Sequence, residues 1–316
     1  MTRLVAVTGA TGFVGGHVAR AFTQAGWRVR ILARRIPLSP QLADLTPDLV
    51  PGSLEDEGAL RALVRRADAV VHAAGSVKAL DTASFHRDNA DGAARMVAAA
   101  HAASPEARFL LISSLSAREP GLSAYAASKR AGERVLETGG TDLDWAILRP
   151  PVVYGPGDRE MLPFFRMAAN GMLAAPDNGP ARLSLIHAAD LARACVAIVD
   201  SREAHQATIE IDDRHPGGYG WPEIATALAG AVGREVRLRR LPRWLFDAIA
   251  GASAGWAGIT KRPAMVTPGK VRELFHPDWV SRMTGFQQIL DWQPQFTVNK
   301  GFSETAAAYR TLGLLR

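Results

Sequence analysis

The stretch that decides the fold lies near the start of the chain, at residues 4–15, and reads Leu4-Val5-Ala6-Val7-Thr8-Gly9-Ala10-Thr11-Gly12-Phe13-Val14-Gly15. It begins as an apolar run of strand length, passes into a turn with three glycines and leads into an amphipathic helical pattern. Backbone without side chains can approach phosphate closely, and the free N–H groups at a helix N-terminus attract it. The stretch predicts a site for the pyrophosphate of a dinucleotide, although similar turns elsewhere serve only packing.

Beyond this turn, apolar runs alternate with helical patterns as far as residue 149. This alternation predicts an α/β fold in which a doubly wound parallel sheet is covered on both faces. We expect strands near residues 3–8, 28–33, 48–50, 68–73, 108–113 and 144–149.

The pattern loosens after residue 155. Residues 156–183 are rich in Gly, Pro and Met, and helix and strand patterns return at 184–213. The sequence therefore predicts a Rossmann nucleotide-binding domain and a smaller, mixed C-terminal substrate-binding lobe. We assign residues 1–155 and 184–213 to the domain, and residues 156–183 and 214–316 to the lobe.

A second feature lies in the middle of the chain, where Ser113-Ser114 ends a buried strand and Tyr125-Ala126-Ala127-Ser128-Lys129 follows on a helix. The spacing of four residues places the Tyr125 phenol and the Lys129 ammonium on one helix face. Hydride transfer to or from an alcohol carbon needs an acid or base of this kind. A free phenol has a pKa of about 10, so we expect Lys129 to lower the pKa of Tyr125 toward neutrality. With the glycine turn, this pair predicts a nicotinamide-dependent oxidoreductase.

Both features resemble the short-chain dehydrogenase/reductase superfamily, in its extended branch of the NAD-dependent epimerase/dehydratase kind. Further motifs that carry the resemblance lie at residues 68–75, 89–92, 148–157 and 186–192, so that it covers nearly the whole chain. It implies the following contacts to the cofactor: Gly9, Thr11, Gly12, Phe13, Val14, Gly15, Ser53, Leu54, Ala73, Ala74, Gly75, Tyr125, Lys129, Pro150, Val152 and Val153.

The resemblance also implies a catalytic set. Tyr125 is the acid or base, Ser114 positions the substrate oxygen, and Lys129 also binds the nicotinamide ribose. Asn89 could support a proton relay, or could serve only as a polar contact inside its helix. Ser113 is expected to be a backbone partner at the strand end.

The end of the second strand bears on the choice of cofactor. An NAD site usually carries a carboxylate there, whereas this chain has Ala33 followed by Arg34 and Arg35. A guanidinium suits a 2′-phosphate, so NADP(H) is predicted, with NAD as the alternative if both arginines are merely solvated. Ser53 stands where the family often has Asp, which weakens the expected contact to adenine.

The substrate is predicted mostly by exclusion. Leu115 and Ser116 replace the Asp-Glu pair of sugar-nucleotide dehydratases, and Leu183 replaces an arginine with which sugar-nucleotide epimerases often hold a diphosphate, with Arg182 one residue out of register. We expect the substrate to be a secondary alcohol or ketone of an apolar, sterol-, terpenoid- or aryl-like molecule. The alternatives are a nucleotide-sugar epimerase and a non-catalytic cofactor-holding scaffold, against which the intact Ser114, Tyr125 and Lys129 argue.

One apolar stretch, residues 244–259, carries a single charge at Asp247. A short apolar helix between basic clusters can lie in a membrane interface, so peripheral membrane contact through 237–262 is predicted, as at the sterol dehydrogenase and dihydroflavonol reductase end of the family. The alternative is a helical hairpin packed on the lobe or at a homodimer contact. The flanking basic residues are Arg237, Arg239, Arg240, Arg243, Lys261 and Arg262.

Composition narrows the class of protein further. The chain has 316 residues, a net charge of +6 and one cysteine, Cys195, which is expected to be buried. Its arginines are dispersed, so nucleic-acid binding is not expected, and no metal site is predicted. The first strand begins almost at Met1, and no apolar run reaches the ~18 residues of a spanning helix. We therefore expect a cytoplasmic enzyme, with membrane association as a variant.

Overall fold

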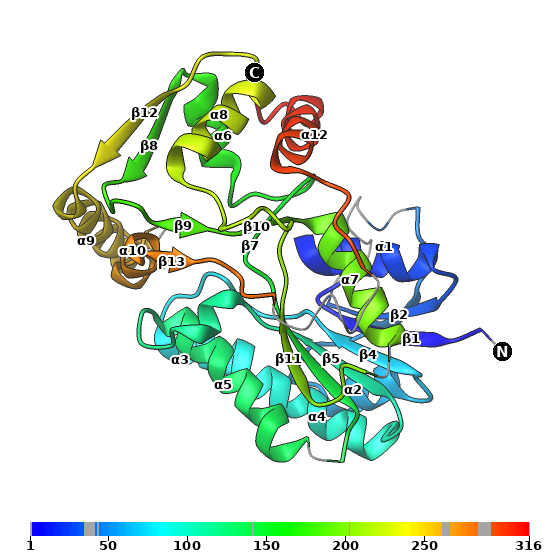
Figure 1. Ribbon diagram of the computed structural model, residues 1–316. Coiled ribbons are helices and arrows are strands. Elements are labelled where there is room, and N and C mark those ends of the chain that lie inside the picture. The colour runs from blue at the N-terminus through cyan, green and yellow to red at the C-terminus, as the bar shows by residue number, and fades with distance from the viewer. Residues whose placement is uncertain are drawn as a thin grey trace.

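The computed structural model describes residues 2–34, 42, 44–140, 142–201, 203–260, 266–283 and 292–315, without the side chains of 254–260. Its centre is a parallel seven-stranded sheet in the order β11-β6-β5-β4-β1-β2-β3 (Figure 1). The order reverses between β1 and β4, which is where doubly wound sheets bind ligands. The strands are β1 Leu4–Thr8, β2 Arg28–Ala33, β3 Asp48–Pro51, β4 Ala69–His72, β5 Arg108–Ile112, β6 Trp145–Arg149 and β11 Ala207–Glu210. The predicted fold class is confirmed, and the six predicted strands agree with these bounds within one residue.

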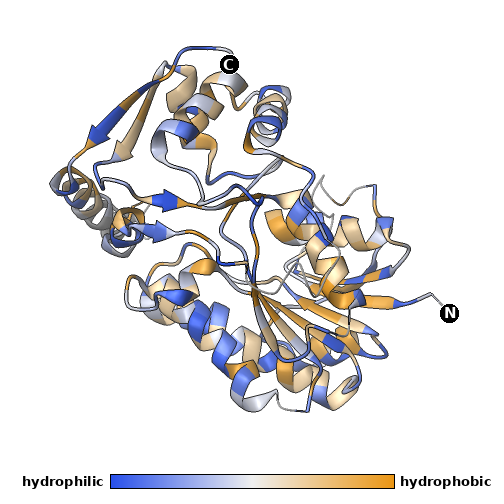
Figure 2. Ribbon diagram, in the orientation of Figure 1, coloured by the Kyte–Doolittle hydropathy of each residue, from blue (hydrophilic) through white to orange (hydrophobic). Residues whose placement is uncertain are grey.

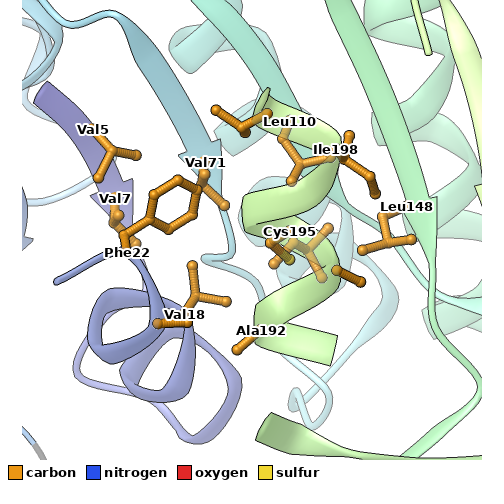
Figure 3. Close-up of a cluster of buried hydrophobic side chains, with 14 of the residues drawn as sticks. Val5, Val7, Val18, Phe22, Val71, Leu110, Leu148, Ala192, Cys195 and Ile198 are labelled. Atoms are coloured by element: carbon orange, nitrogen blue, oxygen red, sulfur yellow. The ribbon is translucent and has the colours of Figure 1, made fainter. Parts of the chain in front are cut away.

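Helices cover both faces of the sheet. Alternate residues of the strands point to opposite sides, so the central strands, such as Leu4–Thr8 and Ala69–His72, are buried throughout. Figure 3 shows one side, where Phe22 of α1 and Cys195 of α7 pack over the sheet, and Cys195 is a buried, free thiol. The covering helices are α1 Phe13–Gln24 and α7 Ala188–Asp200 on this face, and α2 Glu57–Val64, α4 Gly92–Ala103 and α5 Ala124–Gly139 on the other.

A separate apolar core holds the smaller lobe together. Phe165, Leu228, Phe302 and Tyr309 meet there from three different helices. Figure 1 shows the lobe above the sheet, with α12 next to the end of the chain. The elements of the lobe are α6 Leu162–Ala169, β8 Met172–Pro176, β9 Arg182–Leu183, α8 Trp221–Val232, β12 Arg237–Leu241, β13 Asp278–Trp279 and α12 Val298–Thr311. We keep the predicted division of the chain at residues 155, 183 and 213 as a proposal.

Shorter elements join the two parts. The strands β7 Val152–Tyr154 and β10 Leu185–His187 pair in parallel, and α3 Thr82–His86 follows the loop after β4. The predicted apolar stretch lies within one helix, α9 Arg243–Thr260, which packs on the next helix, α10 Pro268–Phe275. Within the described residues, no helix is both long and apolar enough to cross a membrane.

Candidate active site

The glycine turn lies between the end of β1 and the start of α1. Gly9 has a φ of +73°, and a Cβ on it would lie 2.6 Å from the backbone N of Ala74. A Cβ on Gly15 would lie 2.1 Å from the carbonyl oxygen of Gly9. Gly12 forms the N-cap of α1 without a side-chain hydrogen bond, and no acidic residue lies in the first turn. The geometry leaves the N-terminus of α1 open to an anion, so it fits a dinucleotide pyrophosphate.

The other residues that are predicted to contact the cofactor near its pyrophosphate lie in this turn or next to it. Thr11 and Gly12 are exposed, and Phe13 and Val14 are half-buried. The Thr8 hydroxyl lies 2.8 Å from His72 Nδ1 and accepts a 3.3 Å hydrogen bond from Ala74 N. The loop after β4, with Ala73, Ala74 and Gly75, is thereby fixed beside the turn.

The same loop also approaches Asn89 and Lys129. A Cβ on Gly75 would lie 2.5 Å from Asn89 Oδ1 and 3.8 Å from Lys129 Nζ. The structure therefore brings the glycine turn, Asn89 and Lys129 to one edge of the sheet. This is the edge at which the parallel strands have their carboxyl ends.

Ser114, Tyr125 and Lys129 lie together at this edge. The helix α5 begins at the N-cap Ser123, whose hydroxyl accepts a 2.9 Å hydrogen bond from Ala126 N. Tyr125 shares a side-chain hydrogen bond with Ser114, and Phe85 of α3 packs against its ring. Lys129 Nζ donates to the carbonyl oxygen of Ile112 at 2.8 Å, at the end of β5.

The protonation of this pair differs from the expectation. Burial raises the pKa of Tyr125 to about 12; the hydrogen bond to Ser114 lowers it, and the Glu273 carboxylate raises it. Lys129 is not among the groups that shift the pKa of Tyr125. Burial lowers the pKa of Lys129 to about 8, against the opposing effect of Glu133. Without bound cofactor, the phenol is thus protonated at neutral pH, and the expected lowering by Lys129 is wrong for this state.

Asn89 lies in a π-helical turn, Arg87–Asp91, and its side-chain amide is engaged on both sides. Nδ2 donates to the Ser76 carbonyl oxygen at 3.1 Å and to Ser128 Oγ at 2.8 Å, while Oδ1 accepts from Ser76 N at 2.9 Å. These bonds tie the loop after β4 to α5. These hydrogen bonds support the predicted role of Asn89 as a polar contact. Its role in a proton relay stays a prediction.

A buried carboxylate that the sequence analysis missed lies beneath this site. Glu133 is fully buried one helical turn after Lys129 and accepts a 2.5 Å hydrogen bond from Ser113 Oγ. Arg149 of β6 binds both of its oxygens, at 2.8 and 2.6 Å. Ser113 is therefore bound through its side chain as well as through its backbone N, which donates to Leu148 O. The signal that could have revealed Glu133 was its spacing of four residues from Lys129.

A second missed carboxylate comes from the lobe. Glu273 of α10 is 6% exposed and accepts a hydrogen bond from Ser123 Oγ. Arg272 Nε donates to the Leu122 carbonyl oxygen at 2.7 Å, and a Cβ on Gly269 would lie 2.8 Å from Ser123 Cβ. The helix α10 is therefore docked on the start of α5, directly before Tyr125. No local pattern could have predicted a contact between residues 150 positions apart.

The remaining predicted contacts lie around the strand ends. Arg34 is exposed after the last residue of β2, and Arg35 lies outside the described residues. The Ser53 hydroxyl accepts a 3.2 Å hydrogen bond from Glu55 N, and the partly buried Leu54 packs against the core on the α2 side of the sheet. Pro150 O accepts from Leu115 N at 2.8 Å. Val152 and Val153 lie on β7, with Val152 41% exposed.

The arginine beside the expected diphosphate position has structural partners. Arg182 donates to the carbonyl oxygens of Gly217 and Gly218 and to Glu223 Oε2 at 3.0 Å. Its neighbour Leu183 pairs with Tyr219 of the same lobe. The guanidinium is therefore used in holding the lobe together.

The sequence profile of the NAD dependent epimerase/dehydratase family matches residues 5–211. A ceramide reductase of Caulobacter vibrioides is 40% identical to this chain over 312 residues, covering 99% of the chain and 96% of that protein. A 2-alkyl-3-oxoalkanoate reductase of Stenotrophomonas maltophilia is 29% identical over 50% of the chain and 53% of that protein.

Solved structures share the fold. The crystal structure of gox2253 has a TM-score of 0.79 at 18% identity, with 100% of both chains covered. MoeE5 in complex with UDP-glucuronic acid and NAD has a TM-score of 0.74 at 19% identity, covering 98% of this chain and 99% of that chain. The motifs, the sheet order and the matched profile agree, and the chain belongs to the NAD-dependent epimerase/dehydratase family of NAD(P)-binding enzymes.

Proposed function

We propose that this protein is an NADP-preferring ketoreductase that reduces a ketone flanked by long apolar chains, as in a ceramide-type lipid. The observation that carries the proposal is the Tyr125 phenol, hydrogen-bonded to Ser114 and one helical turn from Lys129 at the carboxyl edge of the sheet. Two relatives named for ketone or ceramide reduction support the substrate class, and one of them is similar over nearly the whole chain.

The residues divide the reaction as follows. The Ser114 and Tyr125 hydroxyls hold the substrate carbonyl oxygen by hydrogen bonds, and Tyr125 donates its proton to the alkoxide that forms there. With its pyrophosphate held at the glycine turn, a bound reduced nicotinamide cofactor would supply the hydride that the carbonyl carbon needs. Lys129, with a pKa of about 8, is mostly charged at neutral pH and places a cation on the same face of α5, one helical turn after Tyr125. The product is a secondary alcohol.

The protonation of Tyr125 fits its role as the acid in ketone reduction. A phenol with a pKa of about 12 holds its proton throughout the neutral range and can donate it to an alkoxide.

The end of β2 supports NADP(H). No carboxylate stands at Ala33 to bind the ribose 2′-hydroxyl or to repel a phosphate, and the exposed Arg34 follows directly. A guanidinium is suited to a phosphate because it donates several hydrogen bonds in one plane.

The two alternatives receive less support. A nucleotide-sugar epimerase needs cationic groups for the diphosphate, and the nearest arginine to the expected position, Arg182, is already bound to Gly217, Gly218 and Glu223. A cofactor-holding scaffold would not need the hydrogen-bonded pair of Ser114 and Tyr125.

The test is a direct comparison of substrates. Purified protein is incubated with NADPH and a detergent-dispersed ceramide-type ketone, and separately with NAD and UDP-glucose. We expect NADPH oxidation and a secondary alcohol in the first assay and no epimer in the second. Epimerisation of the sugar nucleotide without ketone reduction would make the epimerase alternative correct.

A further inference from the structure

The outer end of the lobe exposes a group of arginines next to apolar side chains. The strands β8 and β12 pair so that Arg237 lies beside Met172 and Arg239 beside Ala174. Between them, Leu173 and Leu238 pack into the core of the lobe, so the alternating positions Met172, Arg237 and Arg239 belong to the outward side. Met172 is 44% exposed.

The helix α9 continues this surface. Its first turns pack on α10 through Phe246, whose ring centroid lies 5.4 Å from that of Phe275. Trp244, two residues earlier and therefore on the other side of the helix, is 68% exposed. Ile249 is 45% exposed. Figure 1 places β12, β8 and α9 together at the outer end of the lobe. In Figure 2, β12 is largely hydrophilic, while α9 mixes pale and hydrophobic residues with a few hydrophilic ones.

The charges of this surface are only partly compensated. Arg240 lies 3.9 Å from Asp177, and Arg243 lies 3.5 Å from Asp247. In the described parts of the chain, Arg237 and Arg239 have no acidic partner within salt-bridge distance. We call the set Met172, Arg237, Arg239, Arg243 and Trp244 the arginine–tryptophan face; Arg240 alternates with Arg239 and belongs to the other side of β12. It combines excess positive charge with exposed apolar groups.

We propose that the arginine–tryptophan face docks on an anionic lipid bilayer. Phosphate headgroups would bind Arg237 and Arg239, while the Trp244 ring would lie at the headgroup level, where tryptophan is enriched in membrane proteins. A protein partner or a second copy of the chain would need a complementary acidic surface. The bilayer supplies negative charge and apolar depth together, which is what this face can bind.

The arginine–tryptophan face is linked through α9 and α10 to the site around Tyr125. The inference about the substrate that follows from this link rests on the proposed function. The helix α9 packs on α10, and α10 contacts the start of α5 through Arg272 and Glu273, next to Tyr125. Docking would thus place the lobe side of the site near the bilayer. A long-chain ketone could then reach Tyr125 without crossing bulk water.

The experiment is co-sedimentation of the full chain with vesicles of phosphatidylglycerol mixed with phosphatidylcholine, compared with phosphatidylcholine alone. We expect binding only to the anionic vesicles, and release at high salt. Arg237→Ser and Arg239→Ser should each weaken binding about fivefold, and the double variant about 25-fold, since each basic residue contributes on the order of 1 kcal/mol near such a surface. Trp244→Ser should weaken binding several-fold.

Matched controls come from other surfaces. Arg134→Ser on α5 removes an exposed arginine, and Leu312→Ser removes a side chain that is 63% exposed, close to the value for Trp244. Neither should change vesicle binding. Equal loss in the controls, binding to neutral vesicles, or no binding at all would overturn the proposal. So would a wild-type dimer that Trp244→Ser converts to monomer.

Activity separates this proposal from the proposed function. With a water-soluble ketone, the Arg237→Ser/Arg239→Ser variant should retain the wild-type rate, whereas its rate with a vesicle-embedded ketone should fall in parallel with binding. Vesicle binding without reduction of any ketone would refute the proposed function alone. Reduction of soluble ketones without vesicle binding would refute the docking alone.

Discussion

The helix α5 and the helix α9 use their side chains in opposite ways. Around α5, nearly every polar group has a partner: Lys129 binds Ile112 O, Ser128 binds Asn89, and Glu133 binds Ser113 and Arg149. The helix α9 packs on α10 on one side and leaves Trp244 exposed on the other. The comparison teaches that the proposed reacting groups lie where hydrogen bonds hold their neighbours in place. The surface that we propose for membrane binding lies where side chains are exposed.

The largest expected effect concerns the fixed side of this comparison. Tyr125→Phe should lower turnover by about 10²-fold or more, since a positioned acid contributes about that much, while NADPH binding stays nearly unchanged. The matched control is Tyr309→Phe, because the Tyr309 hydroxyl is buried without a hydrogen-bond partner among the described residues. Steady-state kinetics measures turnover, and a cofactor titration measures NADPH binding, for both variants. An active Tyr125→Phe enzyme would remove this residue from the mechanism.

The next effect tests how tightly the glycine turn is packed. Gly9→Ala places a Cβ 2.6 Å from Ala74 N, in addition to the strain of its positive φ, so it should abolish NADPH binding and cost more than ~1–2 kcal/mol of stability. Gly26→Ala has a φ of +79° but no atom within 4 Å, so it isolates the strain alone. Urea unfolding gives the difference between the two variants. Equal losses would show that crowding at Gly9 is unimportant.

A third effect concerns cofactor preference. Arg34→Ser should reduce the preference for NADPH over NADH by ~1–3 kcal/mol, the range for a charge-assisted hydrogen bond. Ala33→Asp should favour NADH, because its carboxylate would repel a 2′-phosphate. Titration calorimetry with both cofactors measures the change, with Arg134→Ser as the exposed control. Equal affinity of the wild-type protein for both cofactors would contradict the assignment.

The smallest effect tests the contact between the two parts. The Glu273 carboxylate raises the pKa of Tyr125, so Glu273→Gln should lower it. The phenol should therefore begin to ionise at a lower pH in the variant. A spectrophotometric titration of tyrosinate, with the signal of the Tyr125→Phe protein subtracted, shows the shift, and Glu235→Gln, on the exposed surface, should leave the titration profile unchanged. An unshifted profile would mean that Glu273 acts on α5 only by packing.

Much of the nucleotide domain could be predicted because its signals are local. Buried strands such as Arg108–Ile112 are apolar after their first residue, and the four-residue spacing of Tyr125 and Lys129 fixes their common helix face. The contacts that the sequence analysis missed are either distant or depend on burial. Glu273 meets Ser123 across 150 residues, and the pKa of Tyr125 follows from desolvation that no sequence pattern records. Arg182 was considered for a diphosphate, but its partners at Gly217 and Gly218 lie on a later loop.

The hydroxyl of Ser123 has two simultaneous bonds, accepting from Ala126 N and donating to Glu273. Any movement of α10 away from α5 would break the second bond, and with it the polarisation that strengthens the first. The first turn of α5, which carries Tyr125, would then be free to fray. Product release and the loss of an ordered proton donor would then happen together. The enzyme would not reduce other carbonyl compounds while α10 is away from α5.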